Sequence, residues 1–378
     1  MIHTVFLLLA NIRDLVIRFL PGFAGRLLVG KGEFAFVVHP RDLSDTKRKY
    51  PFARYLPKAV IEVWSRYQWP TVASRIEGLV TRSGRKVNGW VVICPMTTKL
   101  MIKNRNVARK RVLQTVRLAE KLGAKIVGLG AFTSIVTRDG RTLIGKTRVG
   151  ITSGNAYSAA VAIENLERLM SLTGRELRES TLAVVGGAGS VGSACSKILA
   201  KKAKKLIIVD KNKRELKDLM DYINIDGVVK GRTDVASIKE ADGIIVVTNA
   251  PGAIVRASHL KRGAVVVDAA QPKNVSRHIP DQRDDVIVVE SAIVRSNGIE
   301  CNFDFGLNYG EALGCLAEVI LLAWMEHKGN YSLGKVDLAQ VEEVSKLAKE
   351  LGFKSADFRN SSGNIKKEQI LTLKDIST

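Results

Sequence analysis

Three glycines in the middle of the chain have the spacing of a dinucleotide-binding turn, G-x-G-x-x-G. They follow an apolar run at 182–185 that predicts a buried strand, and a helical stretch from 190 to 200 comes next. We expect the first glycine to permit the turn, the second to admit a pyrophosphate, and the third to let the helix pack closely. The alternative is a turn that binds no nucleotide. The predicted cofactor-binding residues of this turn are Gly187, Gly189, Ser190, Val191 and Gly192.

A second predicted strand, 206–209, ends in an acid that bears on the choice of cofactor. Asp210 stands where an acid usually accepts a hydrogen bond from the ribose 2′-hydroxyl of NADH. Its charge would repel the 2′-phosphate of NADPH. Lys211, Lys213 and Arg214 would offset that repulsion. The residues alone therefore leave NADH and NADPH open.

Further apolar runs predict strands at 243–248, 263–268 and 286–289, alternating with helical stretches. This pattern is typical of a parallel, doubly wound sheet, whose ligands lie beyond the carboxyl ends of the strands. We therefore predict an α/β protein with a Rossmann-type nucleotide domain and a second α/β domain for the substrate. The residues expected to join the glycine turn along this edge are Asp210, Lys211, Asn212, Thr248, Asn249 and Lys273.

Cys315 is the candidate for covalent chemistry. It lies in an apolar stretch that predicts a helix, and the pair Asn308 and Glu311 has the form of a capping box at the start of that helix. This start places Cys315 one to two turns into the helix, where the dipole lowers the pKa of a thiol only modestly. Glu318 follows three residues later, on roughly the same helix face. Two roles stay open for the thiol: a nucleophile or a small core residue.

The length of 378 residues predicts at least two domains. We expect a boundary at the polar stretch around Gly174, before the nucleotide domain. The predicted parts are an apolar amphipathic segment (1–30), a substrate domain (31–175), an NAD(P)-binding Rossmann domain (176–300), a returning helix with Cys315 that completes the substrate domain (301–350), and a polar C-terminal tail (351–378).

The charge is strongly positive, because 59 lysines and arginines outnumber 37 acids and leave +22. Such a balance favours an acidic partner, which could be an anionic membrane, a nucleic acid or an acidic carrier protein; the alternative is a solvated basic surface. The stretch 97–122 predicts one or two helices whose basic face is best placed for that partner. No nucleic-acid-binding module is visible, so we expect no nucleic acid.

The cysteines predict neither a metal site nor a disulfide framework, since Cys94, Cys195, Cys301 and Cys315 form no C-x-x-C pair. This usage fits a reducing cytoplasm. No apolar run reaches the length of about 18 residues that a membrane span needs. The apolar stretch 4–28 lacks the features of a signal peptide. It predicts either a helix buried in the fold or an amphipathic helix at the inner face of the membrane, with Arg13, Arg18 and Arg26 at the headgroups.

Six segments together resemble the long-chain fatty acyl-(acyl carrier protein) reductases, the aldehyde-forming family best known from cyanobacteria. They are 128–136 (GLGAFTSIV), 152–155 (TSGN), the glycine turn, 267–274 (VDAAQPKN), 315–318 (CLAE) and 330–334 (NYSLG). The resemblance covers about residues 90–355. Residues 1–85 do not obviously match, and Tyr157 stands where a histidine is expected in the family. Both departures leave the acyl donor open and suit a non-cyanobacterial branch.

The resemblance implies a mechanism and a set of partners. Cys315 matches the family's nucleophile, which attacks an acyl thioester and releases the carrier thiol; a nicotinamide hydride then reduces the acyl-enzyme to an aldehyde. Cys315 and Glu318 are therefore the catalytic candidates. NADPH is the implied cofactor, with NADH still open because of Asp210, and the acyl donor is an acyl carrier protein or acyl-CoA. The reaction needs no metal.

Two other functions remain open at this point. One is a shikimate- or amino-acid-dehydrogenase-like oxidoreductase on a polar substrate, for which we find no convincing Lys–Asp catalytic pair. The other is a nucleotide-binding protein without catalysis, associated with a membrane or a nucleic acid. The oligomeric state is left open by the sequence.

Overall fold

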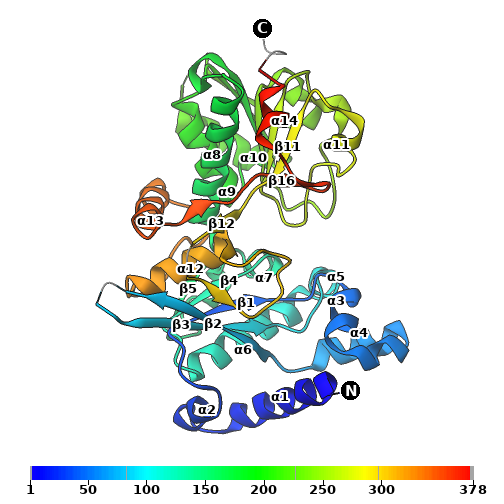
Figure 1. Ribbon diagram of the computed structural model, residues 1–378, viewed down its shortest axis with the longest axis vertical. Coiled ribbons are helices and arrows are strands. Elements are labelled where there is room, and N and C mark those ends of the chain that lie inside the picture. Colours follow the sequence, from blue (N-terminus) through cyan, green and yellow to red (C-terminus); the bar gives the residue numbers. More distant parts are fainter. Residues whose placement is uncertain (1, 82, 226, 297, 375–378) are drawn as a thin grey trace. The chain divides into compact units, whose positions relative to one another are not determined.

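The computed structural model describes residues 2–81, 83–225, 227–296 and 298–374. The chain folds into two compact units, each made of two stretches of sequence (Figure 1). Unit 1 comprises Met1–Gly154 and Ser296–Gly334, and unit 2 comprises Asn155–Arg295 and Lys335–Thr378. The chain therefore passes from one unit to the other three times.

Unit 1 is built on a six-stranded sheet in the order β13-β2-β3-β1-β4-β5. Four of these strands run parallel, and β2 and β13 extend the sheet on one side in antiparallel pairing. The strands are β1 (Phe34–Val38), β2 (Thr71–Val80), β3 (Lys86–Ile93), β4 (Ile126–Leu129), β5 (Gly150–Thr152) and β13 (Glu300–Cys301). The other elements of unit 1 are α1 (Ile2–Phe19), α2 (Gly22–Val29), α3 (Leu43–Lys49), η1 (Pro51–Tyr55), α4 (Lys58–Tyr67), α5 (Thr98–Lys103), α6 (Arg105–Lys121), α7 (Phe132–Val136), η2 (Arg141–Leu143), β14 (Glu311–Leu313) and α12 (Gly314–Trp324).

Strand β1 is apolar throughout because helices cover both faces of the sheet. Side chains alternate between the faces of a strand. Ala35 and Val37 join the core cluster that contains residues of α6. Phe36 points to the other face, where a side chain on Gly128 would meet both Phe36 and Val319 of α12. Helix α12 is therefore packed directly on the sheet, across β4 and β1.

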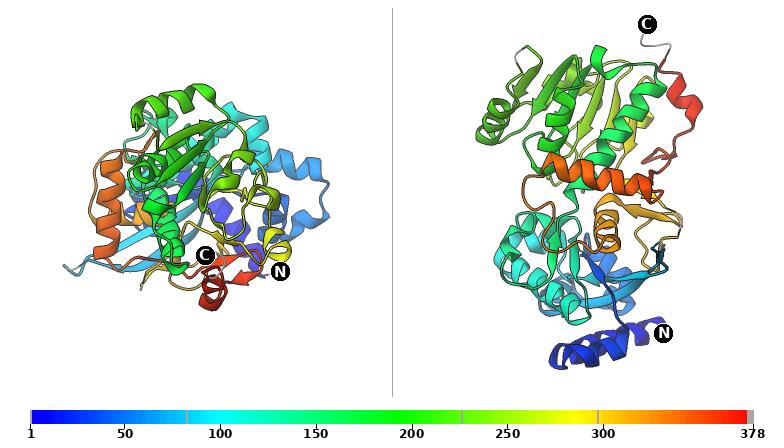
Figure 2. Two further views of the ribbon diagram at one scale, coloured as in Figure 1. Left: turned by 90° about the horizontal axis from the view of Figure 1, so that it is seen from above. Right: turned by 90° about the vertical axis from the view of Figure 1, so that its left-hand side faces the viewer.

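The N-terminal helices α1 and α2 lie at the margin of unit 1 (Figures 1 and 2). Asp14 is buried and accepts a hydrogen bond from the backbone N–H of Val72 at 2.8 Å, which ties α1 to β2. Lys121 Nζ donates to backbone carbonyls at the end of α1, including that of Leu20 at 3.0 Å. The opposite side of this helix pair is apolar and exposed. Its exposed large side chains are Leu9, Ile12, Val16, Phe19, Phe23, Leu27 and Leu28.

Unit 2 contains a fully parallel six-stranded sheet in the order β8-β7-β6-β9-β10-β11. Numbered along the chain, this is the order 3-2-1-4-5-6 of a Rossmann sheet, which confirms the predicted doubly wound α/β fold. The strands of unit 2 are β6 (Thr181–Val185), β7 (Lys205–Val209), β8 (Val229–Arg232), β9 (Gly243–Val246), β10 (Val265–Asp268), β11 (Ile287–Glu290), β12 (Ile293–Arg295), β15 (Lys354–Ser355), β16 (Arg359–Asn360) and β17 (Gly363–Asn364). Its helices are α8 (Asn155–Leu172), η3 (Leu177–Glu179), α9 (Ser190–Ala200), α10 (Lys213–Ile223), η4 (Val235–Glu240), η5 (Ala257–His259), α11 (Ile279–Gln282), α13 (Leu338–Glu350) and α14 (Lys367–Leu371).

The unit boundaries differ from the predicted ones. The first boundary falls at Gly154 rather than near Gly174, because α8 belongs to unit 2 and not to the predicted 31–175 domain. Helix α13 likewise packs on α8 and α9 in unit 2 instead of completing the substrate domain (Figure 2). The predicted polar tail, 351–378, is folded as far as 374, since Phe353, Phe358, Ile370 and other apolar side chains within it are buried. Its last residues, 375–378, lie outside the described part.

None of the helices in the described residues is long and apolar enough to span a membrane. Helix α1 has the length but carries Arg13, Asp14 and Arg18. Of the two alternatives for this stretch, burial of the whole helix in the fold is wrong, because several of its apolar side chains are exposed.

Candidate active site

The glycine turn between β6 and α9 has the close contacts that its sequence pattern requires. A Cβ on Gly192 would lie 2.0 Å from the carbonyl oxygen of Gly186, so only glycine lets the helix approach the turn. The left-handed φ of +83° is at Gly186, one position before the glycine that we expected to make the turn. Gly187 instead needs to be small because a Cβ there would lie 2.5 Å from Ile208 Cγ2. A Cβ on Gly189 would have one neighbour within 4 Å, the carbonyl oxygen of Gly186 at 3.2 Å. The backbone of Gly189 is therefore open to a phosphate.

The predicted loops at the carboxyl edge of the sheet in unit 2 are linked to one another. Asp210 accepts hydrogen bonds from the backbone N–H groups of Ala188 in the glycine turn, at 3.0 Å, and of Asn212, at 2.9 Å. Thr248 donates its hydroxyl to the side chain of Asn274, which is buried. These bonds link the turn to the end of β7 and the loop after β9 to the loop after β10, all at the carboxyl edge of the parallel sheet.

The other predicted cofactor residues differ in exposure. Lys211 and Asn212 are exposed beside the N-terminus of α10, and Asn249 is exposed in the loop after β9. Lys273 is bound to its own loop, because Nζ donates to the carbonyl oxygen of Asp268 at 3.0 Å. Burial lowers the pKa of Lys273, and the nearby Asp268 and Glu290 oppose that effect.

Cys315 is the second residue of helix α12, which begins at Gly314. The predicted capping box is wrong as a helix start: Asn308 and Glu311 do exchange hydrogen bonds, but the chain continues as strand β14. The thiol therefore lies in the first turn of α12, where the helix dipole acts most strongly on a thiolate. Cys315 also keeps part of its surface exposed, whereas Cys94 and Cys195 are buried.

Glu318 is fully buried one turn after Cys315. Its Oε1 accepts hydrogen bonds from the hydroxyls of Thr152 and Ser332, the latter at 2.7 Å. Ser153 donates its hydroxyl to the carbonyl oxygen of Ser332. These bonds join α12 to the end of β5 and to the segment 330–334, so three distant stretches of sequence meet one helical turn after Cys315.

Gly154 allows the chain after β5 to touch Cys315. Its φ is +76°, and a Cβ there would lie 2.2 Å from Cys315 Cβ and 2.4 Å from Cys315 Cα. No side chain larger than hydrogen fits between these two backbones. The segment 152–155 has therefore a larger role than the helix start that its capping-type residues predicted.

The electrostatics of Cys315 favour the protonated thiol. Burial raises the pKa of Cys315 to about 12, and the charge of Glu318 adds to the rise. Hydrogen bonding with the backbone of Leu316 and of Cys315 itself acts in the opposite direction.

Sequence reasoning missed the role of Asn155, the first residue of α8. Its side-chain amide donates to the hydroxyl of Ser190, at the start of α9, at 2.8 Å. The N-termini of two helices in unit 2 are thus linked at the glycine turn. The TSGN motif could have indicated this role. Thr152 and Ser153 bond to Glu318 and Ser332, while Asn155, in the same motif, bonds to Ser190 at the glycine turn. Tyr157, two residues later, is buried in α8.

The predicted site residues thus fall into two groups. Cys315 and Glu318 lie in unit 1, and all of the predicted cofactor-binding residues lie in unit 2. Within the described residues, no cluster of three or more His, Cys, Asp or Glu is placed to hold a metal ion.

Comparison with known proteins supports a dehydrogenase-type fold. Residues 168–290 match the Shikimate / quinate 5-dehydrogenase family. The chain is 25% identical over 336 residues to a long-chain acyl-[acyl-carrier-protein] reductase of Synechococcus elongatus, covering 82% of this chain and 94% of the reductase. It is also 25% identical over 361 residues to the aminotransferase PigE of Serratia sp., covering 90% of this chain. The chain spans 42% of the length of PigE.

Two solved structures are also similar. Glutamyl-tRNA reductase from Methanopyrus kandleri is 16% identical, with 73% of this chain and 57% of that chain covered and a TM-score of 0.30. The dipicolinate synthase A chain from Bacillus subtilis is 13% identical, with 65% and 69% covered and a TM-score of 0.31.

The sheet order, the glycine turn and the family match together define an oxidoreductase-type fold that binds a nicotinamide nucleotide. The similarity to acyl-(acyl carrier protein) reductases is a family-level resemblance.

The contact between Gly154 and Cys315 can be tested by Gly154→Ala. We expect this variant to lose about 1–3 kcal/mol of unfolding free energy beyond that lost by Gly145→Ala, because the new methyl group overlaps Cys315. Gly145 is a matched control, since its φ is +72° and nothing lies within 4 Å of its Cβ position. Equal losses in the two variants, measured by denaturant unfolding, would refute the contact.

The influence of Glu318 on the thiol can be tested by Glu318→Gln, which keeps the acceptor oxygen and removes the charge. In the parent, the rate of Cys315 alkylation by iodoacetamide should rise about tenfold per unit between pH 7 and 9, because this range lies below the pKa. The variant should react several-fold faster at pH 8.5, since its pKa is lower. Peptide mapping follows Cys315 alone, and Glu342→Gln in α13 is the control. An unchanged rate would show that the charge does not act on the thiol.

Proposed function

We propose that this protein is an NAD(P)H-dependent reductase that converts long-chain acyl thioesters to fatty aldehydes through an acyl-cysteine at Cys315. The observation that carries the proposal is the position of Cys315: a partly exposed residue in the first turn of α12, in contact with the glycine of the TSGN segment. The similarity to the Synechococcus reductase, which extends over almost the whole length of that enzyme, supports the same reaction.

The proposed reaction balances without a metal. The sulfur of Cys315 attacks the thioester carbonyl, the bond from the acyl carbon to the carrier sulfur breaks, and the carrier leaves as a thiol with the proton of Cys315. A nicotinamide bound in unit 2 would supply the hydride that reduces the acyl group; the bond to Cys315 would then break, and one proton from solvent would restore the thiol. The sum is acyl thioester plus NAD(P)H plus H⁺ giving aldehyde, carrier thiol and NAD(P)⁺. Acyl-cysteine chemistry of this kind splits one difficult step into two easier ones.

The role we assign to Glu318 is to position Cys315. Its buried carboxylate accepts two hydroxyl hydrogen bonds and thereby fixes α12 against β5 and the segment 330–334. The backbone of Cys315 is then held in close contact with Gly154.

The residues of unit 2 fit a nicotinamide dinucleotide. The open backbone at Gly189 and the first N–H groups of α9, at Ser190 and Val191, would hold the pyrophosphate. Asp210 would lie near the adenosine ribose. We favour NADPH, because Lys211, Lys213 and Arg214 are all exposed around the N-terminus of α10 and favour a 2′-phosphate.

The proposed acyl donor is an acyl carrier protein or acyl-CoA. Helices α5 and α6 support an acidic carrier, since residues 97–119 contain no acid. Two of their arginines bind the protein itself: Arg109 donates to the carbonyl oxygen of Val136, and Arg111 donates to that of Arg66. The cations that remain exposed on these helices are Lys99, Lys103, Arg105, Lys110 and Arg117.

We also propose that α1 and α2 bind an anionic lipid surface. Leu9, Ile12, Val16 and Phe19 follow one another at helical spacing on the exposed side of α1, and Phe19 and Leu27 are 76% and 83% exposed. The single acid among residues 2–29, Asp14, is buried, so arginines supply the exposed charge of the pair. Apolar side chains flanked by cations alone suit a membrane surface.

The match of residues 168–290 to the shikimate dehydrogenase family supports a second candidate function. This would be a dehydrogenase that acts on a polar hydroxy or amino acid without a covalent step. It shares unit 2 with the first proposal and differs in giving Cys315 no chemical role.

Replacement of the thiol distinguishes the two functions. Cys315→Ser should abolish aldehyde formation and the mass increase of one acyl group that the parent shows when it is incubated with acyl carrier protein thioester and no reductant. Binding of NADPH should be nearly unchanged, because the predicted cofactor residues lie in unit 2. Cys301→Ser, at the other partly exposed cysteine, is the control. Full activity of Cys315→Ser on polar hydroxy or amino acids would favour the second function.

Cofactor choice can be read from kcat/KM for NADPH and NADH. The double variant Lys211→Gln and Arg214→Gln should lower kcat/KM for NADPH about tenfold and leave that for NADH nearly constant, since NADH has no 2′-phosphate. Lys217→Gln, an exposed cation further along α10, controls for general charge. A tenfold preference of the parent for NADH would overturn the choice of NADPH.

Lipid binding can be tested by flotation of the full chain with vesicles of phosphatidylglycerol and phosphatidylcholine. The parent should float, and Phe19→Ser with Leu27→Ser should stay at the bottom, because burial of each side chain contributes about 1.5–3 kcal/mol. Tyr222→Ser, which removes an exposed aromatic ring in unit 2, is the control. A parent that does not float, or that is a dimer dissociated by the double variant, would refute lipid binding.

A further inference from the structure

Unit 1 contains a basic groove around the start of α3. It has a volume of about 520 Å³, and its lining residues are Arg41, Ser44, Asp45, Lys47, Arg48 and Arg54. Four cations against the carboxylates of Asp45 and of Asp304, which pairs with Arg48, leave two net positive charges here. The cations come from the loop before α3, from α3 itself and from η1.

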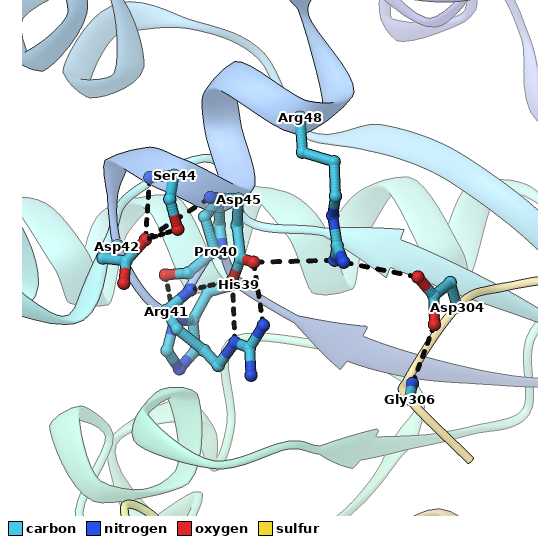
Figure 3. A network of polar contacts seen from close by, with 9 residues as sticks. All are labelled: His39, Pro40, Arg41, Asp42, Ser44, Asp45, Arg48, Asp304 and Gly306. Carbon is cyan, nitrogen blue, oxygen red and sulfur yellow. Dashed lines mark hydrogen bonds and ion pairs between the residues drawn. The ribbon is translucent and has the colours of Figure 1, made fainter.

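Asp45 binds Arg41 by two hydrogen bonds and lies near Arg48, a second of the four cations (Figure 3). Arg41 donates to both carboxylate oxygens, Nε to Oδ2 at 2.9 Å and Nη2 to Oδ1 at 3.0 Å. Arg48 lies between two acids, with Nη2 at 3.5 Å from Asp45 Oδ1 and Nη1 at 3.3 Å from Asp304 Oδ2. The hydrogen bond from Arg41 lowers the pKa of Asp45, so this carboxylate stays charged at neutral pH.

His39 fixes the loop that carries Arg41 through two hydrogen bonds of its ring; Figure 3 shows the one to Pro40. The ring Nδ1 donates to the carbonyl oxygen of Pro40 at 2.9 Å, and Nε2 accepts from the backbone N–H of Phe132 at 3.1 Å. These two bonds define the neutral tautomer, and burial lowers the pKa of His39 accordingly. The position of the Arg41 backbone is therefore set before any ligand arrives.

The other two cations are not neutralised by the protein. Among the residues that the structure describes, the side chains of Lys47 and Arg54 have no hydrogen-bond or ion-pair partner, and Arg54 is exposed. Arg48 is 59% and Asp304 73% exposed in their side chains, and such exposed ion pairs contribute little. The groove thus offers a fixed arginine and three cations available to an anion.

A segment of unit 1 connects the groove to Cys315. Asp304, the partner of Arg48, belongs to the stretch that lines a neighbouring cavity of about 250 Å³. Phe305 in that stretch packs edge-on against Phe36 of β1. The stretch ends at Glu311, and α12 begins at Gly314.

We propose that the groove binds the phosphate of the pantetheine arm that carries the acyl thioester. This inference rests on the proposed function, which places the thioester carbon at Cys315. The arm of acyl-CoA and of acyl carrier protein has a phosphate at the end remote from its sulfur. Guanidinium groups match phosphate oxygens in charge and geometry, which favours a phosphate over an isolated carboxylate. The groove would then hold the far end of the arm while the thioester reacts.

The binding test uses 4′-phosphopantetheine and pantetheine, which differ in the phosphate alone, with the full chain in a calorimeter. The parent should bind 4′-phosphopantetheine at least tenfold more tightly. The triple variant Lys47→Gln, Arg48→Gln and Arg54→Gln should bind both equally. The control Lys239→Gln, Lys346→Gln and Lys349→Gln makes the same change of charge on exposed residues of unit 2 and should keep the preference. Equal affinities in the parent, or a preference that survives in the triple variant, would overturn the proposal.

The kinetic test compares three acyl donors. The triple variant should lose at least tenfold in kcat/KM with both acyl-CoA and acyl carrier protein, and should match the parent with an acyl N-acetylcysteamine thioester, which has no phosphate. A loss confined to acyl carrier protein would assign the groove to acids on the carrier and overturn a phosphate site. A parent that turns over none of the three refutes the proposed function, while the calorimetric comparison still decides on the groove.

Discussion

The hydrogen bonds to the buried carboxylate of Glu318 are the interactions on which the arrangement of unit 1 around Cys315 depends. A charge with no exposure to water is costly unless hydrogen bonds satisfy it, and here the hydroxyls of Thr152 and Ser332 do so. Thr152 belongs to β5 and Ser332 to the segment after α12. The hydrogen bonds that the Glu318 carboxylate needs therefore hold β5, α12 and that segment together. The contact of Gly154 with Cys315 follows from that arrangement.

In unit 2, hydrogen bonds between loops likewise fix parts of the chain that are distant in sequence. The Rossmann strand order brings the ends of β6, β7, β9 and β10 to one edge, and hydrogen bonds connect the end of β6 to that of β7 and the end of β9 to that of β10. Asp210 serves the glycine turn by accepting from Ala188, besides any role with a ribose. Asn274 accepts from Thr248 and donates to the carbonyl oxygens of Ala250 and Gly252, so the loop after β9 is fixed by the loop after β10. An edge of this kind is preorganised for a ligand.

Features that depend on neighbouring residues in sequence were predictable. Strand β6, helix α9 and strand β7 lie within a residue of their expected bounds, because glycine spacing and apolar runs are local signals. The start of α12 was not predictable, since the backbone N–H of Asn308 donates to the Glu311 carboxylate, as in a capping box, and a strand nevertheless follows. The burial of Phe353 and Phe358 in a polar stretch, and the partners of Glu318, depend on contacts between distant residues. The placement of α8 in unit 2 has the same cause.

The interrupted layout of the two units has a consequence for synthesis on the ribosome. The parallel sheet of unit 2 is complete once Glu290 has been made, whereas α12 and Ser332 of unit 1 come later. Until then, the end of β5 lacks the helix against which Gly154 packs, and one face of the first sheet has no cover. The middle of the nascent chain can therefore condense before its beginning does, and the thiol acquires its surroundings among the last events of folding.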